Sequence, residues 1–338
     1  LPDWLVNNAG WWAAKIFTNS DFDFDPEYIK EKIYPCYKIE DDKELKWYQD
    51  NPSILLSDDC FDHTHNSYGF RGDEFEKEKS DDTYRIFAVG ASTTYGRGAS
   101  DSETWPVYLQ QIINEQITDK EIEVINAGVP GATSKSEYNL IKNKVSSFDP
   151  DLIIMYDGWN DSRPENRLTV EDTIRNWESV CKLGKNEGFD TIIIVQPLPI
   201  TGHRVLTEQE IFYSSPHLQY LQNSQQYVDA FKELDKVCSK TTDFGRIFDY
   251  VQEPIWYDHG HTMSFANKVI AENVFSVISP IYFGKTYSVT YTNLNSEPGT
   301  GVIYAVGSDL SNRNFDNLNL KNAVFDKADL SNTSFKNA

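Results

Sequence analysis

The sequence predicts an α/β fold: a three-layer α/β/α sandwich built on a mostly parallel sheet. Short apolar runs rich in β-branched residues recur along the middle of the 338-residue chain, and segments of helical periodicity separate them. The runs are continuously apolar rather than alternating, which is typical of parallel strands buried on both faces. We therefore expect strands at 85–90, 122–128, 151–158 and 191–198.

The segments between these runs have the spacing of amphipathic helices. In 104–117 the apolar residues Trp105, Leu109 and Ile113 recur on one helical face. Strands that alternate with helices form βαβ units, and functional side chains in such sheets gather beyond the carboxyl ends of the strands. Further helices are expected at 134–147, 169–187, 217–239 and 262–278.

The composition bounds the class of protein. Hydrophobic residues make up 39% and aromatic residues 14% of the chain, which is enough for a core and argues against global disorder. The formal net charge of −21 argues against nucleic acid and anionic membrane surfaces as partners, because both would repel the protein. No apolar run approaches the length that spans a bilayer, so no membrane insertion is expected.

The chain has four cysteines, an even number that fits an oxidising compartment. We favour the pairs Cys36–Cys60 and Cys181–Cys238 among the possible pairings, because each pair lies within one region of the chain. The alternative is four buried free thiols. No pair has the CxxC spacing of a zinc ribbon. An extracellular or cell-surface location is the expectation.

The first 80 residues, 1–80, are irregular in pattern and rich in tryptophan. The stretch "LPDWLVNNAGWWA" resembles a short repeat found in secreted and surface proteins of some archaea, and here it occurs once. Its tryptophans either dock on the main domain or form a binding surface. Residues 65–75, "HNSYGFRGDEF", are predicted to form a loop with a glycine-supported turn that leads into the main domain.

The C-terminal residues have a period of five, which neither a helix nor a flat strand has. Leu or Phe recurs at this spacing at Leu310, Phe315, Leu320, Phe325, Leu330 and Phe335. The pattern resembles the pentapeptide-repeat family, which implies a short right-handed β-helix. A segment this short cannot bury its own face, so we expect it to pack on the main domain or to self-associate. The predicted divisions are therefore 1–80, 81–283 as the main domain, 284–305 as a linker and 306–338 as the repeat tail.

Four short motifs carry residues suited to acyl transfer. They are "FAVGASTTYG" (87–96), "GVPGATS" (128–134), "GWNDS" (158–162) and "WYDHGHT" (256–262). In the first three, the candidate residues Ser92, Gly128 to Gly131 and Asn160 follow the ends of predicted strands directly. Acyl transfer requires a nucleophile, a base, an acid that orients the base, and donors to the oxyanion. We assign Ser92 as the nucleophile, His261 as the general base and Asp258 as the orienting acid.

The expected oxyanion donors are the backbone N–H groups of Ser92 and Gly131 and the side-chain amide of Asn160. Alternatives remain open at each position. Ser92 is equally suited to capping a helix. Gly128 competes with Gly131, His259 competes with His261, and Asn160 with Asp161 is also typical of an Asx turn.

The order of these four motifs, over 84–280, is similar to that of the SGNH hydrolases, the GDSL esterase/lipase superfamily. The resemblance implies a flavodoxin-like sheet and a triad of Ser92, Asp258 and His261, with Gly131 and Asn160 as the oxyanion pair. It implies no metal and no organic cofactor.

The chain departs from the family pattern at Ala91, which replaces the Asp of the GDS motif. Position 94 is Thr94 rather than the second glycine of a GxSxG nucleophile elbow, which argues against the larger α/β-hydrolase family. A competing hypothesis is a metal site in "SDDCFDHTH", residues 57–65, although acid-rich loops are usually solvated. Its ligands by residue type would be Asp58, Asp59, Asp62, His63 and His65.

The predicted function is hydrolysis of a short-chain carboxylic ester, with deacetylation of a carbohydrate as the natural task. The expected partner is a small-molecule or carbohydrate ester. One alternative is an O-acyltransferase that uses the same triad on a glycan. Another is a non-catalytic surface or binding protein that works through its tryptophan-rich start and its repeat tail, although a binding protein has no need of the complete set of Ser92, Asn160, Asp258 and His261.

Overall fold

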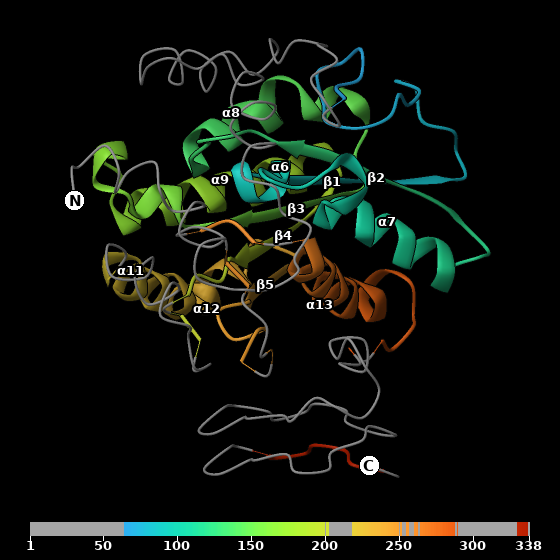
Figure 1. Ribbon diagram of the computed structural model, residues 1–338. Helices are drawn as coiled ribbons and strands as arrows, with labels where there is room; N and C mark the ends of the chain where they lie inside the picture. Colours follow the sequence, from blue (N-terminus) through green and yellow to red (C-terminus); the bar gives the residue numbers. More distant parts are fainter. Residues whose placement is uncertain are drawn as a thin grey trace.

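A parallel sheet with helices on both faces forms the centre of the computed structural model (Figure 1). The helices α7 (Trp105–Gln116) and α13 (Ser264–Tyr282) pack together on one face, and α8 (Ser134–Asn143) and α9 (Val170–Glu187) on the other. The structure describes residues 64–199, 201–202, 218–249, 251, 255–256, 260–262, 264–287, 289 and 330–336.

The five strands of this sheet all pair in parallel, in the order β2-β1-β3-β4-β5. This is the strand order of flavodoxin-like folds, so the predicted fold class is confirmed. The four predicted strands are present with bounds shifted by a few residues, and β5 is an edge strand that the sequence pattern did not predict. The bounds are β1 Thr83–Gly90, β2 Glu121–Gly128, β3 Leu152–Asp157, β4 Asp190–Val195 and β5 Lys240–Asp243.

Two of the predicted helices differ from the observed ones. The helix expected over 217–239 is two helices, α11 (Leu218–Asp229) and α12 (Phe231–Leu234), separated at Ala230. The helix expected over 134–147 ends at Asn143 and continues as a 3₁₀ turn, η4. Lys144, with a φ of −135°, ends the α-helix, and Asp149, which precedes a proline and adopts a positive φ of 50°, ends the 3₁₀ turn. The remaining short elements are α6 Ser92–Tyr95, η3 Asp101–Glu103, η4 Val145–Phe148, η5 Asn160–Ser162 and η6 Pro164–Asn166.

Glycines let α6 approach the carboxyl ends of the central strands. A Cβ at Gly90 would lie 2.2 Å from the hydroxyl of Thr94 and 2.6 Å from the carbonyl of Tyr156. A Cβ at Gly128 would lie 2.1 Å from the backbone nitrogen of Tyr95. Any larger residue would therefore push α6 away from β1 and β2.

The segment before β1 packs into the same core as the sheet. Phe70 lies 5.4 Å from Phe87 of β1 and 5.4 Å from Phe148, ring centroid to ring centroid. The backbone N–H of Arg71 donates to the carbonyl of Asn126 in β2 at 3.2 Å. Residues 64–80 thus contribute to the core of the sheet domain.

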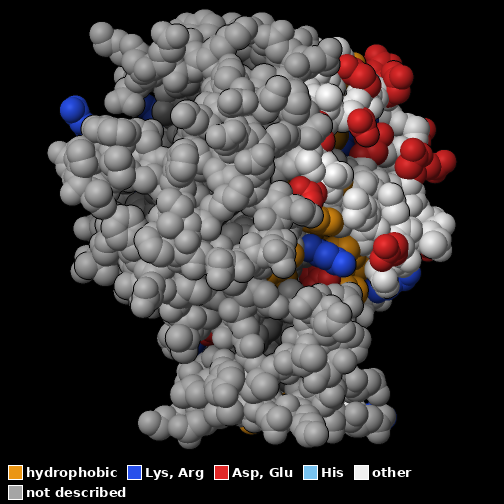
Figure 2. All heavy atoms as spheres, in the orientation of Figure 1, with side chains coloured by type: hydrophobic (Ala, Val, Ile, Leu, Met, Phe, Trp, Pro, Cys, Tyr) orange, Lys and Arg blue, Asp and Glu red, His pale blue; other side chains and the backbone are white. Residues whose placement is uncertain are grey.

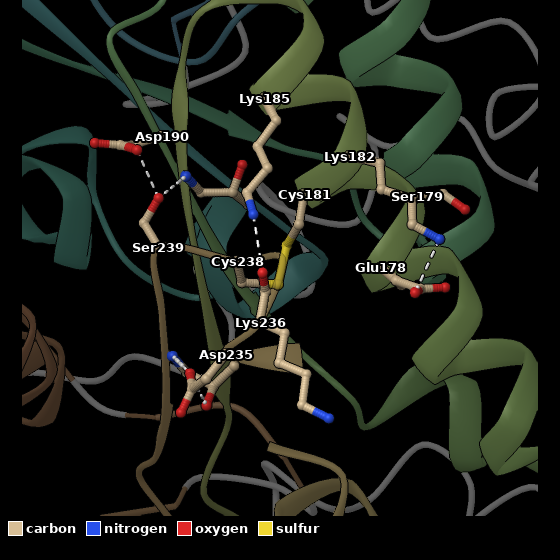
Figure 3. Close-up of a disulfide and its surroundings, with 12 residues drawn as sticks. Glu178, Ser179, Cys181, Lys182, Lys185, Asp190, Asp235, Lys236, Cys238 and Ser239 are labelled. Atoms are coloured by element: carbon tan, nitrogen blue, oxygen red, sulfur yellow. Dashed lines mark hydrogen bonds and ion pairs between the residues drawn. A yellow bond between two sulfur atoms is a disulfide. The ribbon is translucent and has the colours of Figure 1, made fainter. Parts of the chain in front are cut away.

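A disulfide joins Cys181 of α9 to Cys238, which precedes β5, with a Cα–Cα distance of 4.8 Å (Figure 3). It confirms one predicted pair and excludes four free thiols. Hydrogen bonds surround it: Lys185 Nζ donates to the carbonyl of Lys236 at 2.9 Å, and Ser239 Oγ donates to Asp190 at 2.6 Å. The other predicted pair, Cys36–Cys60, lies outside the described residues.

The acidic character of the sequence is visible at the surface. Figure 2 shows several Asp and Glu side chains exposed on the part of this face that the described residues form. Within the residues that the structure describes, no helix has both the length and the apolarity to cross a membrane. The N-terminal tryptophans and most of the repeat tail lie outside the described residues; in the tail, Leu330 and Phe335 are half-buried.

Candidate active site

Ser92 and His261 meet at the carboxyl edge of the sheet. Ser92 is the first residue of α6, directly after β1, and His261 lies just before α13. The serine Oγ and the histidine Nε2 are 2.8 Å apart, although 169 residues separate them in the chain. Both residues are buried, at 7% and 3% relative exposure. A hydroxyl and an imidazole at this distance have the geometry of a nucleophile and its base.

The observed start of α6 argues against the alternative that Ser92 serves only to cap the helix. Ala91 occupies the N-cap position of α6, and Ser92 is the first helical residue. An N-cap side chain would accept from the second or third backbone N–H of the helix. The Ser92 hydroxyl instead bonds the imidazole of His261.

The loop that carries His261 is held on both sides. The indole of Trp159 packs edge-on against the imidazole, with ring centroids 5.6 Å apart. A Cβ at Gly260 would lie 2.1 Å from that indole, so only glycine fits. On the other side, Thr262 Oγ1 donates to Asn267 Oδ1 at 2.7 Å, which ties the loop to the first turn of α13. Asp258 and the competing base His259 lie outside the described residues, and their roles stay predictions.

The side-chain amide of Asn160 uses one of its two N–H groups in a hydrogen bond within the protein. Its Nδ2 donates to the carbonyl of Ala132 at 2.8 Å, and the residue is 3% exposed. A primary amide carries two N–H donors, so this bond orients the group without exhausting it. This geometry suits a fixed oxyanion donor.

Gly131 and Gly128, the two candidates for the backbone oxyanion donor, differ in conformation and in surroundings, and the choice of Gly131 stays a prediction. Gly131 has a φ of 74°, a conformation that favours glycine. The N–H of Gly128 already donates to Asn126 Oδ1 at 3.0 Å. The role of Gly128 is the close contact with α6.

Asp161 connects the two loops that carry these donors, a role that the sequence analysis did not assign. The backbone N–H of Ser134 donates to Asp161 Oδ1 at 2.8 Å, and the Ser134 hydroxyl donates to Oδ2. Asn176 Nδ2 donates to the same hydroxyl at 2.9 Å. The start of α8 is therefore bonded to η5. In the sequence, Asp161 is visible as the Asp of "GWNDS", but nothing in the pattern identifies Ser134 as its hydrogen-bond partner.

Three buried carboxyl groups lie behind this connection. Burial raises the pKa of Asp161 to about 7, and the charge of Asp157 adds to the rise. Burial also raises the pKa of Glu137 well above its usual value, with Asp157 and Asp161 contributing. Trp177 Nε1 donates to Asp157 Oδ2 at 2.9 Å, whereas in the described part of the chain neither carboxyl oxygen of Glu137 has a hydrogen-bond partner. A buried carboxyl group without a hydrogen-bond partner is most stable in its neutral form, in line with the raised pKa of Glu137.

The competing metal hypothesis falls mostly on residues that are not described. Of its five ligands by residue type, His65 alone is described, and its Nε2 lies 3.1 Å from the hydroxyl of Tyr95. In the described part of the chain, no group of three or more His, Cys, Asp or Glu side chains is arranged to hold a metal ion.

The fold and the serine–histidine pair at its carboxyl edge are of the kind found in hydrolases of the α/β/α class. Residues 88–235 match the GDSL-like Lipase/Acylhydrolase family, and residues 306–338 match the Pentapeptide repeats family in eight copies. The chain therefore contains a GDSL-like hydrolase domain followed by a pentapeptide-repeat segment, as both resemblances implied.

No curated protein matches the chain. Among solved structures, TesA is similar at 19% identity and a TM-score of 0.45, covering 58% of this chain and 98% of its own. The esterase EstA from Pseudoalteromonas sp. has 17% identity and a TM-score of 0.43, covering 59% of this chain and 97% of its own. Axe2, an acetylxylan esterase from Geobacillus stearothermophilus, has 13% identity and a TM-score of 0.45, covering 57% of this chain and 92% of its own.

Proposed function

We propose that this protein hydrolyses carboxylic esters with short acyl groups, with Ser92 as the nucleophile and His261 as the general base. The observation that carries the proposal is the 2.8 Å contact between Ser92 Oγ and His261 Nε2, both buried. A serine hydroxyl is a weak nucleophile by itself and is activated when an adjacent base accepts its proton.

In the proposed reaction, Ser92 Oγ attacks the ester carbonyl and its proton passes to His261 Nε2. Asp258 orients the imidazole and stabilises the imidazolium. The oxyanion that forms accepts from the backbone N–H groups of Ser92 and Gly131 and from the free amide N–H of Asn160. His261 then gives its proton to the leaving alkoxide, and a water molecule, activated by the same imidazole, releases the acid and restores the serine.

The proposed natural substrate is an acetylated carbohydrate, and two observations support a soluble, polar ester. The net charge of −21 disfavours anionic substrates such as fatty-acid aggregates. Among the described residues, Ile281 is the one large hydrophobic side chain that is exposed. An enzyme that works at an oil interface needs a larger apolar patch.

We propose that the protein works outside the cytosol. The Cys181–Cys238 disulfide supports this, because such bonds persist mainly in oxidising compartments.

The test compares hydrolysis of p-nitrophenyl acetate, butyrate and octanoate by the native protein, Ser92→Ala and a matched control, Ser179→Ala. Ser179 Oγ donates to a carbonyl within α9, so its loss removes a serine hydroxyl away from the site. We expect kcat/KM to fall steeply with acyl length. We also expect Ser92→Ala to lose on the order of 10³-fold in kcat, with Ser179→Ala unchanged. Equal rates for Ser92→Ala and the native protein would rule out Ser92 as the attacking group.

A further inference from the structure

Arg71 binds the turn that follows the nucleophile. It lies in the segment before β1, outside the residues 88–235 that match the hydrolase family. Its guanidinium is buried and donates to three backbone carbonyls and one carboxylate: those of Tyr95 (2.7 Å), Gly96 (2.8 Å) and Ala99 (2.7 Å), and that of Asp101 (2.8 Å).

The same turn bonds the backbone of Ser92. The N–H groups of Gly96 and Arg97 donate to the Ser92 carbonyl at 3.0 and 2.9 Å. The helix α6 that begins with Ser92 has only four residues, too short to be stable by itself. A cation at the carbonyl end of a helix stabilises it. The turn that Arg71 holds therefore also fixes the backbone of the serine.

Arg71 is itself fixed from three sides. Its guanidinium lies over the Tyr95 ring, 4.9 Å from the centroid. Asp101, which accepts from it, also accepts from the backbone N–H and hydroxyl of Thr64 at 2.7 and 2.8 Å. The backbone N–H of Arg71 donates to the carbonyl of Asn126, whose side chain in turn donates to the Tyr95 carbonyl at 3.2 Å. The segment before β1 thus forms a strap across the end of α6.

We propose that Arg71 is a positioning residue that sets the Ser92 hydroxyl at reacting distance from His261. The inference rests on the proposed function, because it assigns Arg71 an effect on the reactivity of Ser92. Displacing a nucleophile by about 1 Å can lower a rate by about 10²-fold. A lysine cannot replace the arginine, because one ammonium group cannot reproduce the planar set of donors that binds three carbonyls and a carboxylate.

The chain offers a closely matched control in Arg85, near the amino end of β1. Its buried guanidinium also donates to three carbonyls and one carboxylate, and it lies 5.1 Å from the centroid of an aromatic ring, that of Phe75. The groups that accept from it are the carbonyls of Glu76, Lys77 and Phe148 and the carboxylate of Glu123. Arg85→Ala therefore removes an equivalent set of bonds without touching the turn after Ser92.

The experiment measures kcat and KM for p-nitrophenyl acetate, and the rate at which a fluorophosphonate labels Ser92, at a temperature where circular dichroism shows each variant folded. We expect Arg71→Ala and Arg71→Lys to lose about 10- to 100-fold in kcat and in labelling rate, with KM nearly unchanged. Arg85→Ala should lose stability to a similar degree and keep the native kcat. Guanidinium ion at non-denaturing concentration should restore part of the activity of Arg71→Ala and none of that of Ser92→Ala.

Native kcat and labelling in the Arg71 variants, or equal losses in Arg71→Ala and Arg85→Ala, would overturn the inference. If Arg71→Ala does not fold, Arg71→Lys and Asp101→Asn carry the same test. A native protein that neither hydrolyses the ester nor takes the label would overturn the proposed function, and the inference with it. A native protein that does both while the Arg71 variants match it would overturn the inference alone.

Discussion

Asn160 donates its side-chain amide to the backbone carbonyl of Ala132 at 2.8 Å, so the loop after β3 is bonded to the loop after β2. The bond from the Ser134 N–H to Asp161 connects the same two loops again at 2.8 Å. The two loops that carry Gly131 and Asn160, two of the three proposed oxyanion donors, therefore form one unit. Such a unit holds its donors in place before charge develops on the substrate.

The first prediction concerns Asn160. We expect Asn160→Ala to lower kcat for p-nitrophenyl acetate by about 10²- to 10³-fold, with a smaller change in KM, because the lost donor acts mainly on the transition state. Asn273→Ala is the control. Asn273 is also buried, and its amide also donates to a backbone carbonyl at 2.8 Å, within α13. A comparable fall in kcat for Asn273→Ala would attribute the effect to stability instead.

The second prediction concerns Glu137 and pH. Burial raises the pKa of Glu137 in the folded protein, so the protonated form stabilises the fold, and this stability is lost as the pH rises through the folded pKa. The side-chain amide of a Glu137→Gln variant cannot ionise. We therefore expect the free energy of unfolding of this variant to fall less than the native value between about pH 5 and about pH 9.

Urea unfolding midpoints across that range check this expectation. Some decline should remain in the variant, because the pKa of Asp161 is raised to about 7 and its ionisation acts in the same direction. Glu178→Gln, at a partly exposed ion pair with Lys182, should follow the native curve. Parallel curves for Glu137→Gln and the native protein would show that Glu137 does not titrate in this range.

The third prediction concerns Gly260. A methyl group there would lie 2.1 Å from the indole of Trp159, which packs against His261. We expect Gly260→Ala to displace the imidazole and to lower kcat by about tenfold or more while the fold persists. Gly188→Ala, at an open position with a φ of 95°, should cost about 1 kcal/mol of stability and leave kcat unchanged. Native kcat in Gly260→Ala would show that Trp159 does not hold the histidine.

The fourth prediction concerns the disulfide. Replacing Cys181 and Cys238 by serine opens a loop with a sequence separation of 57 residues. Loop-closure entropy then predicts a loss of about 4 kcal/mol in the free energy of unfolding, measured by urea titration. The bridge lies on the amino-end side of β4 and β5, away from the reacting residues, so kcat at low temperature should not change. An unaltered unfolding midpoint would contradict the expectation.

The sequence predicted those features that local pattern determines. Every residue of β3 is buried, and its uninterrupted apolar run made it recognisable as a central parallel strand. Because glycine and polar residues follow three such runs directly, the sequence predicted that Ser92, Gly131 and Asn160 lie at one edge of the sheet. The edge strand β5, Lys240–Asp243, has no apolar run, because only part of it is buried, and it was missed.

Features that depend on partners distant in the sequence could not be predicted. Arg71 and Arg85 bind mainly backbone carbonyls, and a carbonyl carries no residue identity that a pattern could show. The partnership of Asp161 with Ser134 needs the fold to bring two loops together. The pairing of Asp258 with His261 stays a prediction, because Asp258 lies outside the described residues.

The measurement that tests the central claim most directly is phosphonylation by a fluorophosphonate, with the modified residue identified by peptide mass spectrometry. The account predicts a single label on Ser92, formed at least about 10²-fold more slowly in His261→Ala, because the imidazole that accepts the serine proton is gone. A label on another residue, or an equal labelling rate without the histidine, would contradict it.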